Sequence, residues 1–221
     1  MKIIARIYTD FPEKFGIPRQ SGLTEAKAKI VFEPEYRVKE ALIGIEGYSH
    51  LWLIWQFSEA QRETWSPTVR PPRLGGNKRM GVFATRSPYR PNPIGLSSVR
   101  LEGVEYTSEG PVITVSGADI LDGTPIYDIK PYLAYTDSHP DAISGFADEV
   151  RDYSVKVEID GELLSIVDEE KRAELISVLK QDPRPSYQDD PAREYGMCFG
   201  NVEVRFKVSS GVLRVTEIVR K

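Results

Sequence analysis

GVFATRSPYRPNPIGLSSVRL, from Gly81 to Leu101, places three prolines and three arginines between runs that are typical of half-buried β-strands. A proline inside a central strand removes a hydrogen bond from the ladder, so Pro88, Pro91 and Pro93 predict a rigid loop that ends where a strand begins. A loop that prolines hold in one shape suits a binding surface. A tight turn on the rim of a barrel is the alternative interpretation.

Short strands are also predicted over most of the remaining residues up to 147. Runs rich in β-branched and aromatic residues alternate with glycine, proline, aspartate and serine, and such spacing favours a β-barrel or a strongly curved sheet over a doubly wound parallel sheet. One helix is expected over 35–47, where Val38, Leu42 and Ile45 have helical spacing and Gly47 can end it. The strand-like runs are 2–8, 28–32, 50–57, 79–85, 96–106 and 111–118.

After residue 147 the pattern changes to a mixture of strand and helix. The run DEEKRAELISVLKQ predicts a helix, with Asp168 as its cap, Leu175 and Leu179 on one face, and Asp182-Pro183 as its stop. The closing run NVEVRFKVSSGVLRVTEIV predicts a hairpin that turns at 209–211. The sequence therefore predicts a β-barrel domain over 1–147 and a small α+β domain over 148–221.

Composition excludes several classes of protein. The 221 residues are 40% hydrophobic and 28% charged, as in an ordinary soluble domain, and no apolar run approaches the ~20 residues that span a bilayer. The first residues lack the apolar core of a signal peptide, so a cytoplasmic location is expected. One cysteine and two histidines allow no internal disulfide and no Cys/His zinc motif, and we expect no metal. Phosphate-binding, dinucleotide-binding and nucleophile-elbow motifs are missing as well.

Positive charge is concentrated around the opening stretch, although the net charge is −4. Aromatic residues Trp65, Phe83 and Tyr89 lie among these cations, a combination expected of a surface that binds RNA. A solvated charged face is the alternative. Between 62 and 100 the only acid is Glu63, and the cations are Arg62, Arg70, Arg73, Lys78, Arg79, Arg86, Arg90 and Arg100.

The run LDGTPIYDIKPYL, from residue 121, combines a turn signal with a polar row. Asp122-Gly123 predicts a type I′ or type II turn. If the residues after it are extended, Asp128, Lys130 and Tyr132 share one face. Asp119 is interpreted as a turn former, and His50 as a hydrogen-bonded core residue rather than a ligand or base.

Several of these segments together resemble the TsaA-like family of tRNA methyltransferases, usually called TrmO. The resemblance is carried by PRQSGL, HLWLIWQF, DGTPIYDIKPYL, QDPRPSY and, most specifically, by the run from Pro67 to Ser97. It implies a single-sheet β-barrel enzyme that works as a homodimer and takes a methyl group from S-adenosyl-L-methionine. The implied acceptor is the exocyclic nitrogen of threonylcarbamoyladenosine beside the anticodon of certain tRNAs.

The same resemblance implies roles for individual residues. For RNA it implies Asp182, Arg184 and Tyr187, and the basic tract adds Arg79 and Arg90. At position 58 this chain has serine where the family often has histidine, so a cofactor contact there would run through the Ser58 hydroxyl or its backbone. The implied cofactor-binding residues are Pro18, Arg19, Gln20, Ser21, Ser58, Arg86, Leu96, Asp122, Gly123, Thr124 and Pro125.

The reaction expected from this resemblance is an in-line displacement, in which positioning supplies most of the catalysis. Loss of the acceptor's proton would help, and Asp122, Asp128 and Tyr132 are candidate bases. A non-catalytic RNA-binding barrel is the main alternative. A metal-assisted hydrolase would need converging histidines and acids, which the two isolated histidines disfavour.

Overall fold

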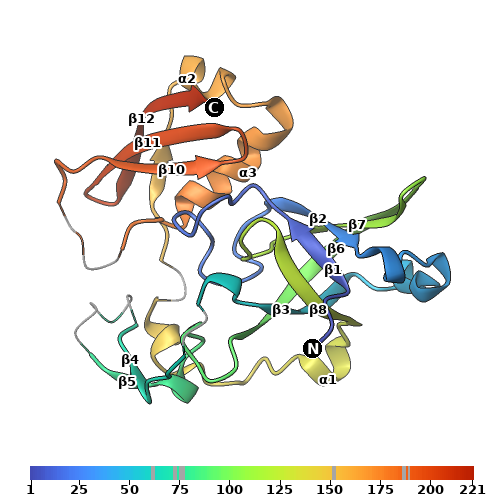
Figure 1. Ribbon diagram of the computed structural model, residues 1–221. Coiled ribbons are helices and arrows are strands. Elements are labelled where there is room, and N and C mark those ends of the chain that lie inside the picture. The colour runs from blue at the N-terminus through green and yellow to red at the C-terminus, as the bar shows by residue number, and fades with distance from the viewer. Residues whose placement is uncertain (61–62, 72–73, 75–77, 151–152, 186–187, 189) are drawn as a thin grey trace.

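The computed structural model describes residues 1–60, 63–71, 74, 78–150, 153–185, 188 and 190–221. Its larger part is a closed barrel of six antiparallel strands in the order β1-β2-β7-β6-β3-β8 (Figure 1). The barrel class predicted from the sequence is confirmed. The strands are β1 (Ala5–Tyr8), β2 (Lys27–Phe32), β3 (His50–Gln56), β6 (Ile94–Thr107), β7 (Gly110–Ser116) and β8 (Thr124–Pro131).

Every second side chain of a barrel strand points into the barrel interior, as β3 shows. In β3 the side chains of Leu51, Leu53 and Trp55 point inward and are at most 5% exposed, while the intervening residues are half-buried. The Trp55 indole lies over Gly95 of β6, and a Cβ added at Gly95 would overlap the ring. A residue without a side chain at 95 therefore lets Trp55 reach Ser97, which becomes important at the site.

A second, smaller sheet has the order β10-β11-β12-β9 and lies above the barrel in Figure 1. Among the described strands only β9 (Lys156–Glu158) and β12 (Val212–Arg220) pair in parallel. The predicted hairpin is confirmed by β11 (Val202–Ser209) and β12, which flank Ser210 and Gly211, and β10 (Tyr195–Phe199) pairs with β11. The predicted helix is α3 (Glu169–Lys180), whose Leu175 and Leu179 are fully buried.

Capping of α3 differs from the prediction in one detail. Asp168 holds the N-cap position, but its side chain accepts no capping hydrogen bond from the helix. Its carboxylate instead accepts from Nη2 of Arg220 at 2.6 Å. Asp160 does cap α2 (Gly161–Ser165), by accepting from the amide of Glu162.

The helix predicted over 35–47 is wrong. Three short 3₁₀ turns occupy this segment, at Pro34–Tyr36, Lys39–Leu42 and Ile45–Gly47. Gly44 has a φ of +88°, which ends any helical path there. Of the three apolar side chains with helical spacing, Leu42 is buried, Ile45 is partly buried and Val38 is 46% exposed.

The strand predicted over 79–85 is also mostly wrong. Only Met80–Gly81 forms a strand, β5, which pairs with β4 (Thr68–Val69), and Val82–Ala84 then makes a 3₁₀ turn. Val82 is the only buried residue of 79–85 and Phe83 is 72% exposed, so the segment does not bury every second side chain as a half-buried strand does. The proline-rich residues after it form a loop, as predicted, and β6 begins at Ile94 directly after Pro93.

The other helical segments among the described residues are α1 (Ala134–Asp137) and two 3₁₀ turns, at Ser58–Ala60 and Gly145–Val150. None of the helices in the described part of the chain has the length and apolar character needed to cross a membrane.

One segment, residues 9–26 between β1 and β2, connects the barrel to the smaller sheet. Phe11 and Ala26 are buried in the core formed by α3 and the second sheet, not in the barrel core. The Asp10 carboxylate accepts from Nζ of Lys171 at 2.5 Å, and the Glu174 carboxylate accepts from the amide of Lys27 at 3.2 Å. The loop that contains the predicted cofactor residues 18–21 is therefore held by both parts of the molecule.

Candidate functional site

Three loops meet where the resemblance predicts a cofactor pocket. Arg86, in the proline-rich loop, donates from Nη1 to Oε1 of Gln20 at 2.5 Å. The amide of Gly22 donates to the carbonyl of Gly117 at 2.8 Å, which brings the first loop against the segment between β7 and β8. Residues from three distant parts of the sequence are therefore brought together, and two of them, Gln20 and Arg86, were predicted cofactor residues.

Asp119 lies at the centre of this meeting point, a role that the sequence analysis missed. Its Oδ1 accepts from Oγ of Ser97 at 2.5 Å, and Ser97 in turn accepts from Nε1 of the buried Trp55 at 2.9 Å. Burial raises the pKa of Asp119, and the hydrogen bonds from Ser97 and from backbone groups and the charge of Arg86 offset only part of that effect. The feature of the sequence that could have indicated this position is that Asp119 stands between two apolar residues, Ala118 and Ile120, which the structure shows to be almost fully buried.

The turn at Asp122-Gly123 forms as predicted and is anchored to β1. The amide of Thr124 donates to the carbonyl of Leu121 at 3.3 Å, and only Gly123 has a positive φ, of +72°, which fits type II rather than type I′. Asp122 accepts from the amide of Thr9 at 2.9 Å. Thr124 and Pro125 are buried, so their side chains shape the turn rather than face solvent.

The side chain of Arg19 contacts the C-terminal part of the chain. Its Nη2 donates to the carbonyls of Asp182, at 3.1 Å, and Arg184, at 2.8 Å. Next to it in sequence, Pro18 is buried and Gln20 contacts Arg86. Arg19 therefore links the predicted cofactor loop to the DPRPSY segment, whose residue Tyr187 lies outside the described residues.

Asp182 and Arg184 form a buried ion pair. Nε and Nη2 of Arg184 each lie 2.9 Å from a carboxylate oxygen of Asp182, and Tyr153 donates its hydroxyl to Asp182 at 2.6 Å. The two residues are 4% and 9% exposed. Burial by itself would raise the pKa of Asp182, but the hydrogen bonds from Arg184 and Tyr153 outweigh burial and lower it. The Arg184 guanidinium thus faces inward, whereas an RNA contact was predicted for it.

The two residues of the basic tract that were predicted to bind RNA, Arg79 and Arg90, differ in their surroundings. Nη1 of Arg90 donates to the carbonyls of Thr85, at 3.1 Å, and Ser87, at 3.3 Å, so its guanidinium braces the proline-rich loop. Arg79 is exposed beside the short β4–β5 ribbon. Of the other cations counted in the tract, Arg62 and Arg73 lie outside the described residues.

The candidate bases do not form one group. Asp122 precedes β8 at one end, while Tyr132 follows it at the other, and at ~3.3 Å per residue the 8 residues of β8 span roughly 26 Å. The predicted polar row is present, since Asp128 and Lys130 form an ion pair at 3.0 Å. Of the remaining predicted cofactor residues, Ser58 is exposed in a short 3₁₀ turn and Leu96 is 56% exposed on the outer side of β6.

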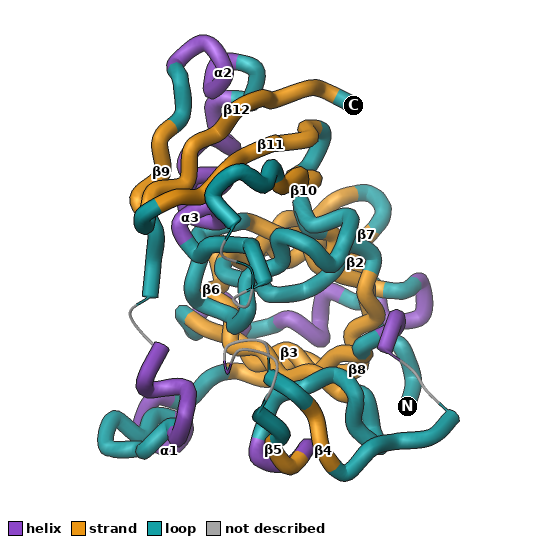
Figure 2. Tube along the Cα trace, turned by 90° about the vertical axis from the view of Figure 1, so that its left-hand side faces the viewer, coloured by secondary structure: helices purple, strands orange, loops and turns teal. Residues whose placement is uncertain are grey.

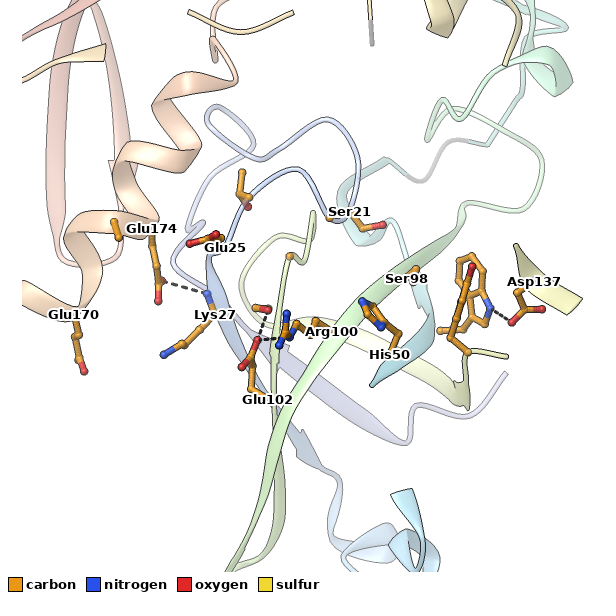
Figure 3. A pocket seen from close by; sticks show the side chains of 17 residues that line it. Ser21, Glu25, Lys27, His50, Ser98, Arg100, Glu102, Asp137, Glu170 and Glu174 are labelled. Carbon is orange, nitrogen blue, oxygen red and sulfur yellow. Dashed lines mark hydrogen bonds and ion pairs between the residues drawn. The ribbon is translucent and has the colours of Figure 1, made fainter. Parts of the chain in front are cut away.

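A cavity of about 830 Å³ lies between the barrel and α3, as Figure 3 shows from close by. His50 lines this cavity and is half-buried, and its Nδ1 lies 2.9 Å from Oγ of Ser49. The expectation that His50 is a core residue is therefore wrong. Of the predicted site residues only Ser21 and Tyr132 reach the cavity. Acidic side chains outnumber basic ones in the lining, so the cavity carries net negative charge and repels phosphate. The acids are Glu25, Glu102, Asp137, Glu170 and Glu174, and the cations are Lys27 and Arg100.

Metal ligands do not gather in the described part of the chain, where no three His, Cys, Asp or Glu side chains are placed to hold an ion.

Comparisons with known proteins were made over the whole chain. The profile described as tRNA-methyltransferase O N-terminal domain matches residues 6–138, and the profile described as TrmO C-terminal domain matches residues 149–221. This chain belongs to the TrmO family. The division at residue 147 falls between the two matched regions and stays a prediction.

Curated and solved members of the TrmO family match most of the chain. A tRNA (adenine(37)-N6)-methyltransferase from Escherichia coli (strain K12) is 39% identical, over 96% of this chain and 94% of its own length. One of the same name from Eikenella corrodens is 44% identical, over 78% and 97%. The crystal structure of TrmO from Pseudomonas aeruginosa superposes with a TM-score of 0.78 at 34% identity, covering 98% of this chain and 97% of that one.

We predict that Asp119→Asn stabilises the protein at neutral pH. A carboxyl whose pKa is raised in the folded state is more easily ionised in the unfolded chain, so its ionisation at neutral pH costs folding free energy. The variant should therefore melt at a higher temperature than the wild type at pH 7. Its advantage should shrink as the pH falls through the raised pKa of Asp119, where the wild-type carboxyl is protonated too. An advantage independent of pH would contradict this.

We predict that Arg184→Ala lowers the free energy of unfolding by roughly 3–5 kcal/mol, because the substitution leaves Asp182 buried without its counter-charge. The matched control is Arg214→Ala, which breaks an exposed pair with Glu158 and should cost about 0–1 kcal/mol. Denaturant titration measures both. Equal losses in the two variants would show that the buried pair does not hold the segment.

Proposed function

We propose that this chain is a tRNA (adenine(37)-N6)-methyltransferase that takes its methyl group from S-adenosyl-L-methionine. The supporting observation is the family match over both parts of the chain, together with relatives that carry this name. One relative from Pseudomonas aeruginosa is named a putative S-adenosylmethionine-dependent methyltransferase. The acceptor we propose is the exocyclic nitrogen of threonylcarbamoyladenosine.

The residues around Asp119 suit the proposed methyl donor. Arg86 is exposed and can pair with a carboxylate, while its neighbour Gln20 offers an amide. The carboxylates of Asp119 and Asp122 lie on the same segment and can accept from ribose hydroxyls or an ammonium. The donor supplies a methyl group on a sulfonium, and an acidic neighbour suits its positive charge. We propose that Pro18, Arg19, Ser21 and the turn 122–125 shape this pocket, with Ser58 and Leu96 at its margin.

The chain's own contribution to the reaction is positioning and proton removal. Transfer forms a bond from nitrogen to carbon as the carbon–sulfur bond breaks, so alignment of the acceptor matters most. The acceptor nitrogen also loses a proton. Of the candidates, Asp128 is engaged by Lys130, and Tyr132 lies at the far end of β8 from the turn. We therefore favour Asp122 or Asp119 as the group that takes this proton.

We propose that RNA contacts come from two regions. Arg79 and the neighbouring cations would meet the phosphates, and Arg90 would act by bracing its loop. The DPRPSY segment, with Asp182, Arg184 and Tyr187, would contribute through the surface that it presents, because the Arg184 guanidinium is paired internally.

We also propose a homodimer in the cytoplasm. Ile94 and Leu96 are 38% and 56% exposed on the outer side of β6, beside Gln56 and Ile54 of β3, and they offer an apolar surface that a second copy can cover. Light scattering at micromolar concentration tests this through the mass, which should be twice that of a single chain.

We predict that the purified chain methylates adenosine 37 of tRNA in the presence of S-adenosyl-L-methionine. We also predict that Arg86→Ala weakens binding of this donor by roughly 1.5–3 kcal/mol, the value of a hydrogen bond to a charged group. Nucleoside mass spectrometry locates the methyl group, and calorimetry measures donor affinity, with Arg214→Ala as the control. A chain that binds tRNA but neither binds the donor nor transfers methyl would instead be the non-catalytic RNA-binding barrel.

A further inference from the structure

Two large aromatic side chains are exposed next to each other at the β4–β5 ribbon. Trp65 precedes β4 and Phe83 follows β5, and their ring centroids lie 5.9 Å apart at an angle of 33°. Trp65 is 51% exposed and Phe83 is 72% exposed. Both figures place the ribbon at the end of the barrel away from the C-terminal sheet (Figures 1 and 2). Side chains of this size are usually buried, because burial of each contributes about 1.5–3 kcal/mol.

The backbone holds these rings in place. Thr68 pairs with Gly81 and Val69 with Met80, and the amide of Val82 donates to the carbonyl of Pro67 at 2.9 Å. Val82 is 1% exposed and anchors the 3₁₀ turn that carries Phe83. The two rings are therefore presented on an anchored ribbon, which lowers the conformational entropy lost when a partner binds.

The charge around the rings is positive. In the described ranges 63–71 and 78–90 the only acid is Glu63, while Arg70, Lys78 and Arg79 are exposed. No carboxylate of the described residues lies within ion-pair distance of these three cations. The cavity beside α3 differs in sign, because acids predominate there.

Exposed rings surrounded by such cations match the chemistry of unpaired RNA. Bases whose stacking partners are missing gain from an aromatic face, and the phosphates on either side gain from cations. A second copy of this chain fits less well, because a two-fold interface at this ribbon would bring its cations together with those of the partner.

We propose that Trp65 and Phe83 form a stacking platform for an unpaired base of the substrate RNA, with Arg70, Lys78 and Arg79 on the flanking phosphates. This inference rests on the proposed function, since it names the part of the RNA loop that the methyltransferase holds. The platform reads the flat face of a base, so it tolerates different bases but requires that the base be unpaired.

The test compares two labelled RNAs, an anticodon stem–loop and a fully paired duplex of equal length, by fluorescence anisotropy. Trp65→Ala and Phe83→Ala should each weaken binding of the stem–loop roughly 5- to 150-fold, as loss of one base–aromatic stack does. Duplex affinity and the dependence of affinity on salt should stay the same, whereas Lys78→Ala should reduce the salt dependence. Trp65→Phe keeps a ring and should largely restore affinity.

The control variant is Tyr106→Ala, which removes another exposed ring that has a lysine, Lys39, 5.5 Å from its centroid. Its hairpin, β6–β7, lies on the other side of the barrel in Figure 1, and its loss should not affect RNA binding. Equal weakening on stem–loop and duplex would overturn the stacking platform. A changed donor affinity would assign the rings to the cofactor, and a halved mass would assign them to a dimer interface. Wild-type protein that binds neither RNA would overturn the proposed function itself.

Discussion

The contact on which the site depends most is the one between the Arg19 guanidinium and the carbonyls of Asp182 and Arg184. β1 and β2 are neighbours in the barrel, and the segment that connects them leaves the barrel and contributes Phe11 to the core of the second sheet. Residues 18–21 are then held from one side by the C-terminal turn and from the other by Arg86 and the Gly117 carbonyl. Changes in the C-terminal turn that Arg19 contacts can therefore alter the loop that we propose to hold the methyl donor.

Two carboxylates, the buried Asp182 and the half-buried Asp119, have opposite pKa shifts and different roles. Asp182 is paired with Arg184 and its pKa is lowered, so its contribution to stability is present above the usual carboxyl range and is lost as the pH falls through its folded pKa. The pKa of Asp119 is raised because burial outweighs its hydrogen bonds, so its ionisation opposes folding at neutral pH. A partly buried carboxylate such as Asp119, whose ionisation costs folding free energy, is more typical of a binding site than of a purely structural position.

Alternation in the sequence predicted the barrel because each strand buries every second side chain, as Leu51, Leu53 and Trp55 do. The helix expected over 35–47 does not form, because the spacing of apolar residues does not reveal that Gly44 has a positive φ, which divides the segment. The sequence also does not predict the direction of the Arg184 side chain. Nothing in DPRPSY shows that Arg184 points inward to Asp182, because an exposed arginine that binds RNA could have the same sequence around it. Asp119 was missed for a related reason, because a carboxylate near a glycine reads as a turn until its burial is known.

The most direct measurement of this shared-loop account is amide hydrogen exchange at Gly22, whose N–H donates to the Gly117 carbonyl at 2.8 Å. In Arg19→Ala the loop loses the hydrogen bonds from Arg19 to the carbonyls of Asp182 and Arg184, so exchange at Gly22 should become faster while the amides of β3 and β6 keep wild-type rates. Arg214→Ala should leave all of these rates as they are. Unchanged exchange at Gly22 in Arg19→Ala would contradict the account, because the contacts of Arg19 with the C-terminal turn would then not be what holds this part of the loop.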